Sequence, residues 1–276
     1  MPIGIDLFSG AGGLSLGAEM AGFQVKFAVE KDKSAAMTYR HNHPNTLVLE
    51  DDIHNIDPWE HLLPNEHVSI IFGGPPCQGF SFSNTMSRNM DNPNNSLFEE
   101  FLRFVNEIQP DWFLFENVEG FVHFKEGKIL HLVEQRFKDM GYQVFPKVLW
   151  ASDYGVPQHR NRFFMVGNRF GIKFEYPKPF GTKITVNDAI GDLPECTAFW
   201  DEEHHSKKKS HEAPESGYTW HKPRYHNTRD MDTFKLLAED IESGKIRPRR
   251  PRIKIRSRRS FWPTPAVWTP PSSSRG

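Results

Sequence analysis

The chain has 276 residues, of which 37% are hydrophobic and 25% charged, as is typical of a soluble globular protein. Its two cysteines, Cys77 and Cys196, exclude a disulfide framework and a CxxC metal site. No apolar run is long enough to span a membrane and no signal peptide opens the chain, so we expect a cytoplasmic protein without a membrane partner.

Charge is distributed unevenly along the chain. The net charge of −1 combines −11 for residues 1–244, which hold all 35 acidic residues, with +10 for residues 245–276. A basic segment of this kind is typical of contact with a polyanion. The alternative is a solvated terminal tail.

Strand-like and helix-like stretches alternate through the first two thirds of the chain. The apolar patterns predict strands at residues 3–8, 24–30, 46–49, 68–72, 111–115, 142–150 and 162–166. Helices are expected at residues 13–22, 32–42, 95–108 and 128–140, with Asp32 as an N-cap. This alternation predicts an α/β fold in which helices cover both faces of a parallel sheet.

Several loops that follow predicted strands are polar or rich in glycine. They read "DLFSGAGG", "VEKD", "EDDI", "GGPPCQGFS" and "FENVEG". In parallel sheets ligands bind beyond the carboxyl ends of the strands, so we expect these loops to meet along one edge. After about residue 170 the alternation fades, and residues 201–217 are predicted to form a mobile loop.

The first of these loops predicts a nucleotide-like cofactor. Gly10, Gly12 and Gly13 lie between a strand and a helix, where glycines allow a ligand to approach the backbone closely. Glu30 ends the second strand, where an acid can accept hydrogen bonds from ribose hydroxyls. Asp52 follows the third strand, within reach of an adenine edge. The alternatives are a surface charge for Glu30 and a helix cap for Asp52.

No GKS or GKT triplet follows the glycines, which argues against a P-loop. The turn contains Phe8 and little positive charge. An adenosine ligand without a pyrophosphate therefore suits it better than a dinucleotide, and S-adenosylmethionine is such a ligand.

The loop at residues 73–81 predicts a nucleophile. It holds Cys77 directly after two prolines and among three glycines, so the thiol is presented on a stiff loop at the ligand edge. Glu116 follows the next strand, and Arg160 and Arg162 are two residues apart, hence on one face of an extended segment. Taken singly, Glu116 fits a helix cap and the arginines fit surface ion pairs.

Together, "DLFSGAGG", "PPCQGFS", "ENV" and "QHRNRFFMVG" resemble, in this order and spacing, the DNA cytosine-5 methyltransferases. The resemblance covers roughly residues 3–170. It implies a Rossmann-like, S-adenosylmethionine-dependent methyltransferase domain at residues 1–170 and part of a smaller target-recognition domain at residues 171–276. It also implies double-stranded DNA as partner, S-adenosylhomocysteine as product, no metal, and a role in restriction–modification.

The resemblance implies roles for individual residues. Cys77 would attack cytosine C6, Glu116 would contact N3 and the exocyclic amine, and Arg160 would contact O2, with Arg162 beside them. The target base must leave the DNA stack to reach this loop. The polar stretch at residues 81–95 is a candidate to close over the DNA. The residues implied at the cofactor are Phe8, Ser9, Gly10, Gly12, Glu30, Asp52, Ile53, Pro75 and Leu97.

The chain departs from the family pattern in its last part. The late "GNSV"-like segment that completes the cofactor pocket in the family is not found in this sequence. One interpretation is a split enzyme in which a second polypeptide supplies the segment, and the alternative is a truncated form. In the basic tail, residues 252–256 ("RIKIR") would present three cations on one face of a strand toward DNA phosphates. Two alternative functions are an RNA methyltransferase of the tRNA type, which Gly79-Phe80-Ser81 disfavours, and a non-catalytic DNA-binding relic.

Overall fold

The computed structural model describes residues 1–76, 97–199, 211–212 and 224–244. The predictions for Cys77, for residues 81–95 and for residues 252–256 therefore lie outside the described residues. The chain divides into two compact units, one formed by Met1–Val186 and the other beginning at Asn187. The site predicted from the sequence lies in the first unit.

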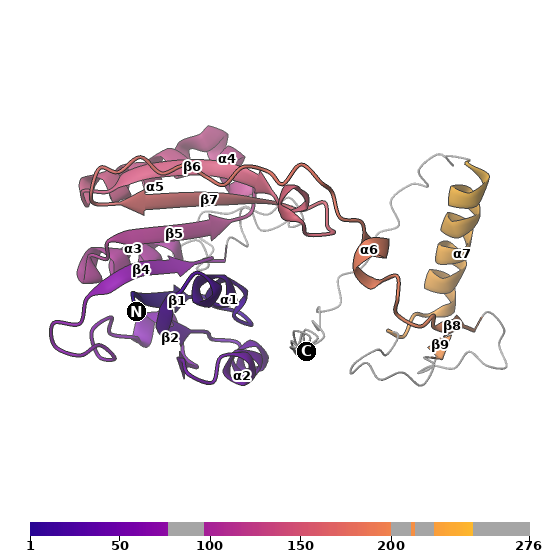
Figure 1. Ribbon diagram of the computed structural model, residues 1–276, viewed down its shortest axis with the longest axis horizontal. Coiled ribbons are helices and arrows are strands. Elements are labelled where there is room, and N and C mark those ends of the chain that lie inside the picture. Colours follow the sequence, from indigo (N-terminus) through magenta and orange to yellow (C-terminus); the bar gives the residue numbers. More distant parts are fainter. Residues whose placement is uncertain (77–96, 200–210, 213–223, 245–276) are drawn as a thin grey trace, which may run out of the picture. The chain divides into compact units, whose positions relative to one another are not determined.

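In the described part of the first unit, seven strands form one sheet in the order β3-β2-β1-β4-β5-β7-β6 (Figure 1). Strands β1 to β5 are parallel to one another. Their bounds are β1 (Ile3–Leu7), β2 (Gln24–Val29), β3 (Leu47–Leu49), β4 (Val68–Gly73), β5 (Trp112–Asn117), β6 (Gln143–Trp150) and β7 (Asn161–Asn168). The predicted Rossmann-like α/β fold is confirmed.

Strand β7 departs from the predicted parallel arrangement, because it is antiparallel to both β5 and β6. A parallel connection needs a crossover of a dozen or more residues, usually a helix. Only residues 151–160 join β6 to β7, and they include the short 3-10 helix η4 (Ala151–Tyr154). The chain therefore turns back on itself and forms a hairpin.

Helices cover both faces of the sheet, as predicted (Figure 1). Helices α1 (Gly13–Met20) and α2 (Lys33–Asn42) cover one face. The Asp32 side chain accepts a hydrogen bond from the Ala35 backbone N–H, which confirms the predicted N-cap of α2. Helices α3 (Leu97–Ile108), α4 (Gly120–His123) and α5 (Lys128–Asp139) cover the other face, with η3 (Phe124–Gly127) between the last two.

Phenylalanine side chains form much of the core between the sheet and α3, α4 and α5. Phe113 on β5 stacks on Phe137 of α5 with ring centres 3.8 Å apart, and Phe101 of α3 meets Phe115 edge-on at 5.3 Å. All four side chains are fully buried. Aromatic pairs of this kind add stability beyond the area that they bury, so they hold β5 and its terminal residues firmly in place.

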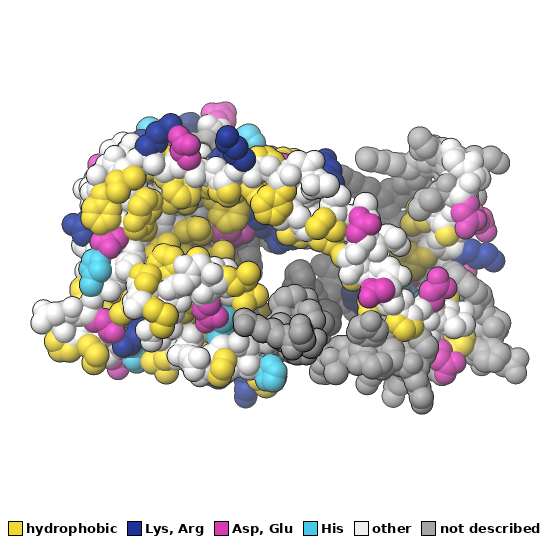
Figure 2. Space-filling view, in the orientation of Figure 1, with side chains coloured by type: hydrophobic (Ala, Val, Ile, Leu, Met, Phe, Trp, Pro, Cys, Tyr) yellow, Lys and Arg dark blue, Asp and Glu magenta, His cyan; other side chains and the backbone are white. Residues whose placement is uncertain are grey.

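The stretch after β7 still belongs to the first unit. The Tyr176 hydroxyl donates a hydrogen bond to the backbone oxygen of Phe145 on β6 at 2.7 Å and lies 3.2 Å from the backbone oxygen of Phe164 on β7. The unit thus extends beyond residue 170, the boundary expected from the sequence. Hydrophobic side chains gather on the face of this unit that Figure 2 shows.

The described part of the second unit contains short elements and one longer helix. They are α6 (Val186–Ile190), which begins at the boundary, the antiparallel pair β8 (Thr197–Ala198) and β9 (His211–Glu212), and α7 (Thr228–Ser243). Strand β9 lies inside the stretch predicted to be a mobile loop. The sequence analysis did not predict α7, whose first turn Asn227 caps by accepting from the Asp230 backbone N–H at 3.0 Å. Within the residues described, no helix is both long and apolar enough to cross a membrane.

Candidate active site

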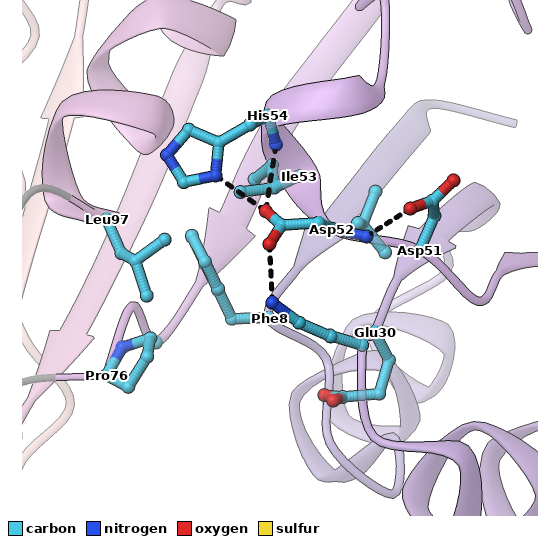
Figure 3. A pocket seen from close by; sticks show the side chains of 11 residues that line it. Phe8, Glu30, Asp51, Asp52, Ile53, His54, Pro76 and Leu97 are labelled. Atoms are coloured by element: carbon cyan, nitrogen blue, oxygen red, sulfur yellow. Dashed lines mark hydrogen bonds and ion pairs between the residues drawn. The ribbon is translucent and has the colours of Figure 1, made fainter. Parts of the chain in front are cut away.

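A pocket of about 490 Å³ lies at the carboxyl edge of β1 to β4 (Figure 3). The residues that line it follow these four strands or begin α3, so the predicted meeting of loops at one edge is confirmed. They are Phe8, Val29, Glu30, Lys31, Asp51, Asp52, Ile53, His54, Gly74, Pro76 and Leu97. Leu97 and Pro76 lie on one side of the pocket, and Asp51 and Asp52 lie on another.

The glycine-rich turn after β1 has the backbone that close approach to a ligand requires. Gly10 and Gly12 have φ of +56° and +93°, values that side chains disfavour. A Cβ on Gly12 would overlap the His43 ring. Phe8 also has a positive φ, +58°, which is uncommon for a bulky residue.

Glu30 braces this turn from the end of β2. Its Oε2 accepts a hydrogen bond from the Gly10 N–H and its Oε1 accepts one from the Asp32 N–H, both at 2.7 Å. A carboxylate has about four acceptor positions, so each oxygen keeps one for a ligand hydroxyl. Glu30 is therefore part of the pocket rather than a solvated surface charge.

Asp52 is held as a carboxylate by two neighbours in the pocket wall. Its Oδ2 accepts from Lys31 Nζ at 2.5 Å, and its Oδ1 lies 2.6 Å from His54 Nδ1 (Figure 3). The hydrogen bonds from Lys31 and His54 lower the pKa of Asp52 well below its ordinary value. Asp52 also caps the 3-10 helix η1 (Ile53–Asn55). The side chain therefore serves as the helix cap named as the alternative and also lines the pocket.

Other predicted cofactor residues adjoin the pocket without lining it. They are Ser9, Gly10, Gly12 and Pro75, and their cofactor contacts stay predictions. The Ser9 hydroxyl is buried and has no hydrogen-bond partner among the described residues. The sequence analysis missed two lining residues, Lys31 and His54. Lys31 directly follows Glu30, and His54 lies two residues after Asp52.

Glu116 ends β5 on the same edge of the sheet. Its Oε1 forms an ion pair with Arg162 Nε at 2.8 Å. Burial raises the pKa of Glu116 to about 7, against the opposing charge of Arg160. A Cβ on Gly74 would lie 2.7 Å from Glu116 Oε2, so a larger residue there would displace the carboxylate from its present position.

The antiparallel direction of β7 explains why the two arginines reach Glu116. Because β7 runs opposite to β5, its first residues lie beside the last residues of β5, and Asn117 pairs with Phe163. Arg162 thus contacts Glu116 directly, while Arg160 is exposed and acts on it through charge.

A second link joins the end of β5 to the cysteine loop. Asn117 Nδ2 donates to the Pro75 backbone oxygen at 3.2 Å, and Asn117 is almost fully buried. The start of the loop, two residues before Cys77, is therefore fixed beside Glu116. The described residues contain no group of three or more His, Cys, Asp or Glu side chains placed to hold a metal ion.

Comparison with known proteins identifies the family. The family model of the C-5 cytosine-specific DNA methylases matches residues 3–262. The chain belongs to this family. Among curated relatives, the Type II methyltransferase M1.HphI of Haemophilus parahaemolyticus is 42% identical over 198 residues, which cover 70% of this chain and 53% of the relative.

Two further comparisons agree. The Type II methyltransferase M.AquIA of Picosynechococcus sp. is 39% identical over 222 residues, covering 70% of this chain and 89% of the relative. A crystal structure of a protein assigned as a DNA modification methyltransferase of an E. coli prophage superposes with a TM-score of 0.61 at 37% identity, over 72% of this chain and 57% of that one. The chain thus spans about half the length of M1.HphI and most of M.AquIA.

Proposed function

We propose that the protein transfers a methyl group from S-adenosylmethionine to C5 of a cytosine flipped out of duplex DNA, as the modification enzyme of a restriction–modification system. The observation that supports this best is the Glu116–Arg162 pair beside the loop that leads to Cys77, on the edge that also holds the pocket. Family membership supports the choice of DNA and of cytosine C5.

The lining of the pocket suits an adenosine group. Glu30 and Asp52 are acceptors for ribose hydroxyls and an adenine amino group, and Phe8, Ile53 and Leu97 supply apolar contact. Lys31 is already paired with Asp52, so it is poorly available to hold a pyrophosphate. When bound, S-adenosylmethionine supplies an electrophilic methyl group.

In the proposed mechanism Cys77 and Glu116 activate the cytosine together. The Cys77 thiolate forms a bond to C6, the C5–C6 π pair shifts to C4–C5, and the C4–N3 π pair moves onto N3, so that the resulting enamine is nucleophilic at C5. Glu116 stabilises that charge by contact with N3 and the exocyclic amine. A pKa of about 7 lets the Glu116 carboxyl carry a proton to N3 near neutral pH.

The arginines keep the pyrimidine in place while this occurs. Arg160 is exposed at the edge and is the proposed contact to cytosine O2. Arg162 orients Glu116 through its ion pair. Once C5 carries the methyl group, a base takes the C5 proton, the C5–H electron pair re-forms the C5–C6 double bond, and sulfur leaves as the Cys77 thiolate. The N3 proton returns to Glu116.

A covalent trap tests this function. Duplex DNA with 5-fluorocytosine at the target should form a stable adduct with the protein in the presence of S-adenosylmethionine, because fluorine does not leave as a proton does. Cys77→Ser should abolish the adduct in denaturing electrophoresis, and Cys196→Ser, the matched control, should leave it intact. Trapping by the Cys77→Ser variant would overturn the assignment, and trapping on RNA alone would favour the tRNA-type alternative.

The predicted second polypeptide receives no support from the comparisons and stays a prediction. Its test is a methyl-transfer assay on this chain alone with mixed-sequence duplex DNA. Site-specific turnover by the chain alone would contradict it.

A further inference from the structure

The Arg103 side chain connects two walls of the pocket, although Arg103 is not among the lining residues. Its Nη2 donates hydrogen bonds to the backbone oxygens of Ile53 at 3.0 Å and Ile56 at 3.1 Å. These oxygens belong to the segment 52–56, which contains η1 and forms the acidic wall of the pocket. Arg103 itself lies on α3, whose first residue, Leu97, lines the pocket from another side (Figure 3).

A neighbouring acid fixes the direction of this guanidinium. Arg103 Nε donates to Glu100 Oε2 at 2.8 Å, one turn earlier on α3. Glu100 Oε1 in turn lies 4.0 Å from His54 Nε2, so the pair contacts the segment at a second point. Because both charged side chains are partly buried, solvent screens this pair less than it screens exposed pairs.

The segment 52–56 needs an anchor from outside. Helix η1 is a single short 3-10 turn, whose hydrogen bonds have poorer geometry than those of an α-helix. Within it, Ile53 O accepts from the Ile56 N–H at 3.2 Å, which is a long bond. The guanidinium of Arg103 can donate from Nη2 to two carbonyls while its Nε holds a carboxylate, because its N–H groups point in fixed directions, whereas an ammonium has no such fixed geometry.

We propose that Arg103 is a positioning residue for cofactor binding, which holds Asp52 and Ile53 at the distance from Leu97 that an adenosine group needs. This inference rests on the proposed function, because it takes the pocket to be the cofactor site. Arg103 acts through the backbone of the segment 52–56 and does not touch the ligand.

Calorimetric titration with S-adenosylhomocysteine tests the proposal. Arg103→Met should weaken binding by about tenfold or more, the effect of losing hydrogen bonds from a charged donor. Arg103→Lys should restore part of the affinity. The matched control is Arg136→Met, which also removes an arginine that contacts an acid of α3, since Arg136 lies 3.7 Å from Glu99. The Arg136→Met variant should bind S-adenosylhomocysteine as tightly as the unmodified protein does.

Hydrogen exchange of the backbone amides at residues 52–57 provides a readout that needs no ligand. These amides should exchange faster in Arg103→Met, and not in Arg136→Met, while amides of β1 and β5 keep their protection. If Arg103→Met fails to fold, Arg103→Lys and Arg103→Gln serve in its place. Unchanged affinity and unchanged exchange in the folded variants would overturn the proposal.

A double-mutant cycle separates positioning from a general loss of stability. Asp52→Asn and Arg103→Met should weaken S-adenosylhomocysteine binding less than additively when combined, because both act on the same wall. Fully additive effects would contradict the proposal. If the unmodified protein does not bind S-adenosylhomocysteine, the proposed function fails, and the exchange measurement still decides whether Arg103 holds the segment.

Discussion

At the scale of single residues, Glu116 shows how a fold adapts a carboxyl group to proton transfer. It is enclosed at the end of β5, so desolvation favours its neutral form, while the charge of Arg160 favours the carboxylate. Arg162 occupies Oε1 and leaves Oε2 toward Gly74 and the loop. The two effects bring the pKa of Glu116 to about 7, near the pH at which a proton donor works best.

The raised pKa predicts a pH dependence of stability. The pKa of Glu116 is about 7 when folded and 4.5 ordinarily, so the folded state holds the proton more tightly. Its contribution to stability is therefore complete below about pH 4.5 and is lost as the pH rises through about 7. Glu116→Gln removes this titration, and its stability relative to the unmodified protein should rise by up to about 3 kcal/mol across that window.

Urea unfolding at several pH values between 5 and 8 measures this difference. Glu99→Gln is the control, because Glu99 lies on α3 and its side chain is more exposed than that of Glu116. A difference between Glu116→Gln and the unmodified protein that stays constant with pH would contradict the prediction.

At the scale of elements, the hairpin of β6 and β7 brings Arg160 and Arg162 to the end of β5, where Glu116 lies. The same arginines on a parallel strand would begin at the opposite edge of the sheet, far from Glu116. Asn161 Nδ2 donates to Glu119 Oε2 at 2.6 Å and ties the start of β7 to the segment after β5. The close approach of β7 to the core depends on Gly167, where a Cβ would overlap the Phe113 ring.

Two glycine substitutions should have opposite effects on stability. Gly167→Ala should lower the free energy of unfolding by about 1–3 kcal/mol, because the added methyl group overpacks the core between β7 and Phe113. Gly17→Ala, on α1, meets open space and should raise it by about 0.5–1 kcal/mol by favouring the helix. Urea unfolding measures the free energy of unfolding of both variants. A change of the same sign and size in the two variants would contradict the packing described for Gly167.

At the scale of the whole molecule, the uneven charge of the chain has a consequence for DNA binding. Residues 1–244 carry a net charge of −11 and would repel a phosphate backbone, whereas residues 245–276 carry +10. Those last residues lie outside the described structure, so their role stays a prediction. Contacts to phosphates are independent of sequence and sensitive to salt.

Replacing Arg252, Lys254 and Arg256 together by alanine tests this role. If each cation neutralises one phosphate, the slope of log K against log salt concentration should become less steep by about 0.9 for each of the three. Binding to DNA of any sequence should weaken similarly, as measured by fluorescence anisotropy between low and moderate salt. An unchanged slope would indicate a tail that does not bind phosphates.

Much of this protein follows from its sequence. Periodicity and capping signals predicted β1 to β5 and their helices, because local hydrophobic pattern and helix ends are encoded in neighbouring residues. Parallel strands end at the same edge of a sheet, which placed Phe8, Glu30 and Asp52 together at that edge. Helix α7 was missed, since the polar stretch around it obscures its pattern.

The tertiary structure alone decided the remaining contacts. Whether β7 runs parallel or antiparallel depends on the path of residues 151–160, and that path brings Arg162 against Glu116. The bonds from Arg103 to Ile53 and Ile56 span about fifty positions in sequence and target backbone oxygens. A backbone acceptor carries no side-chain signature, so only the folded chain shows which carbonyls a distant arginine can reach.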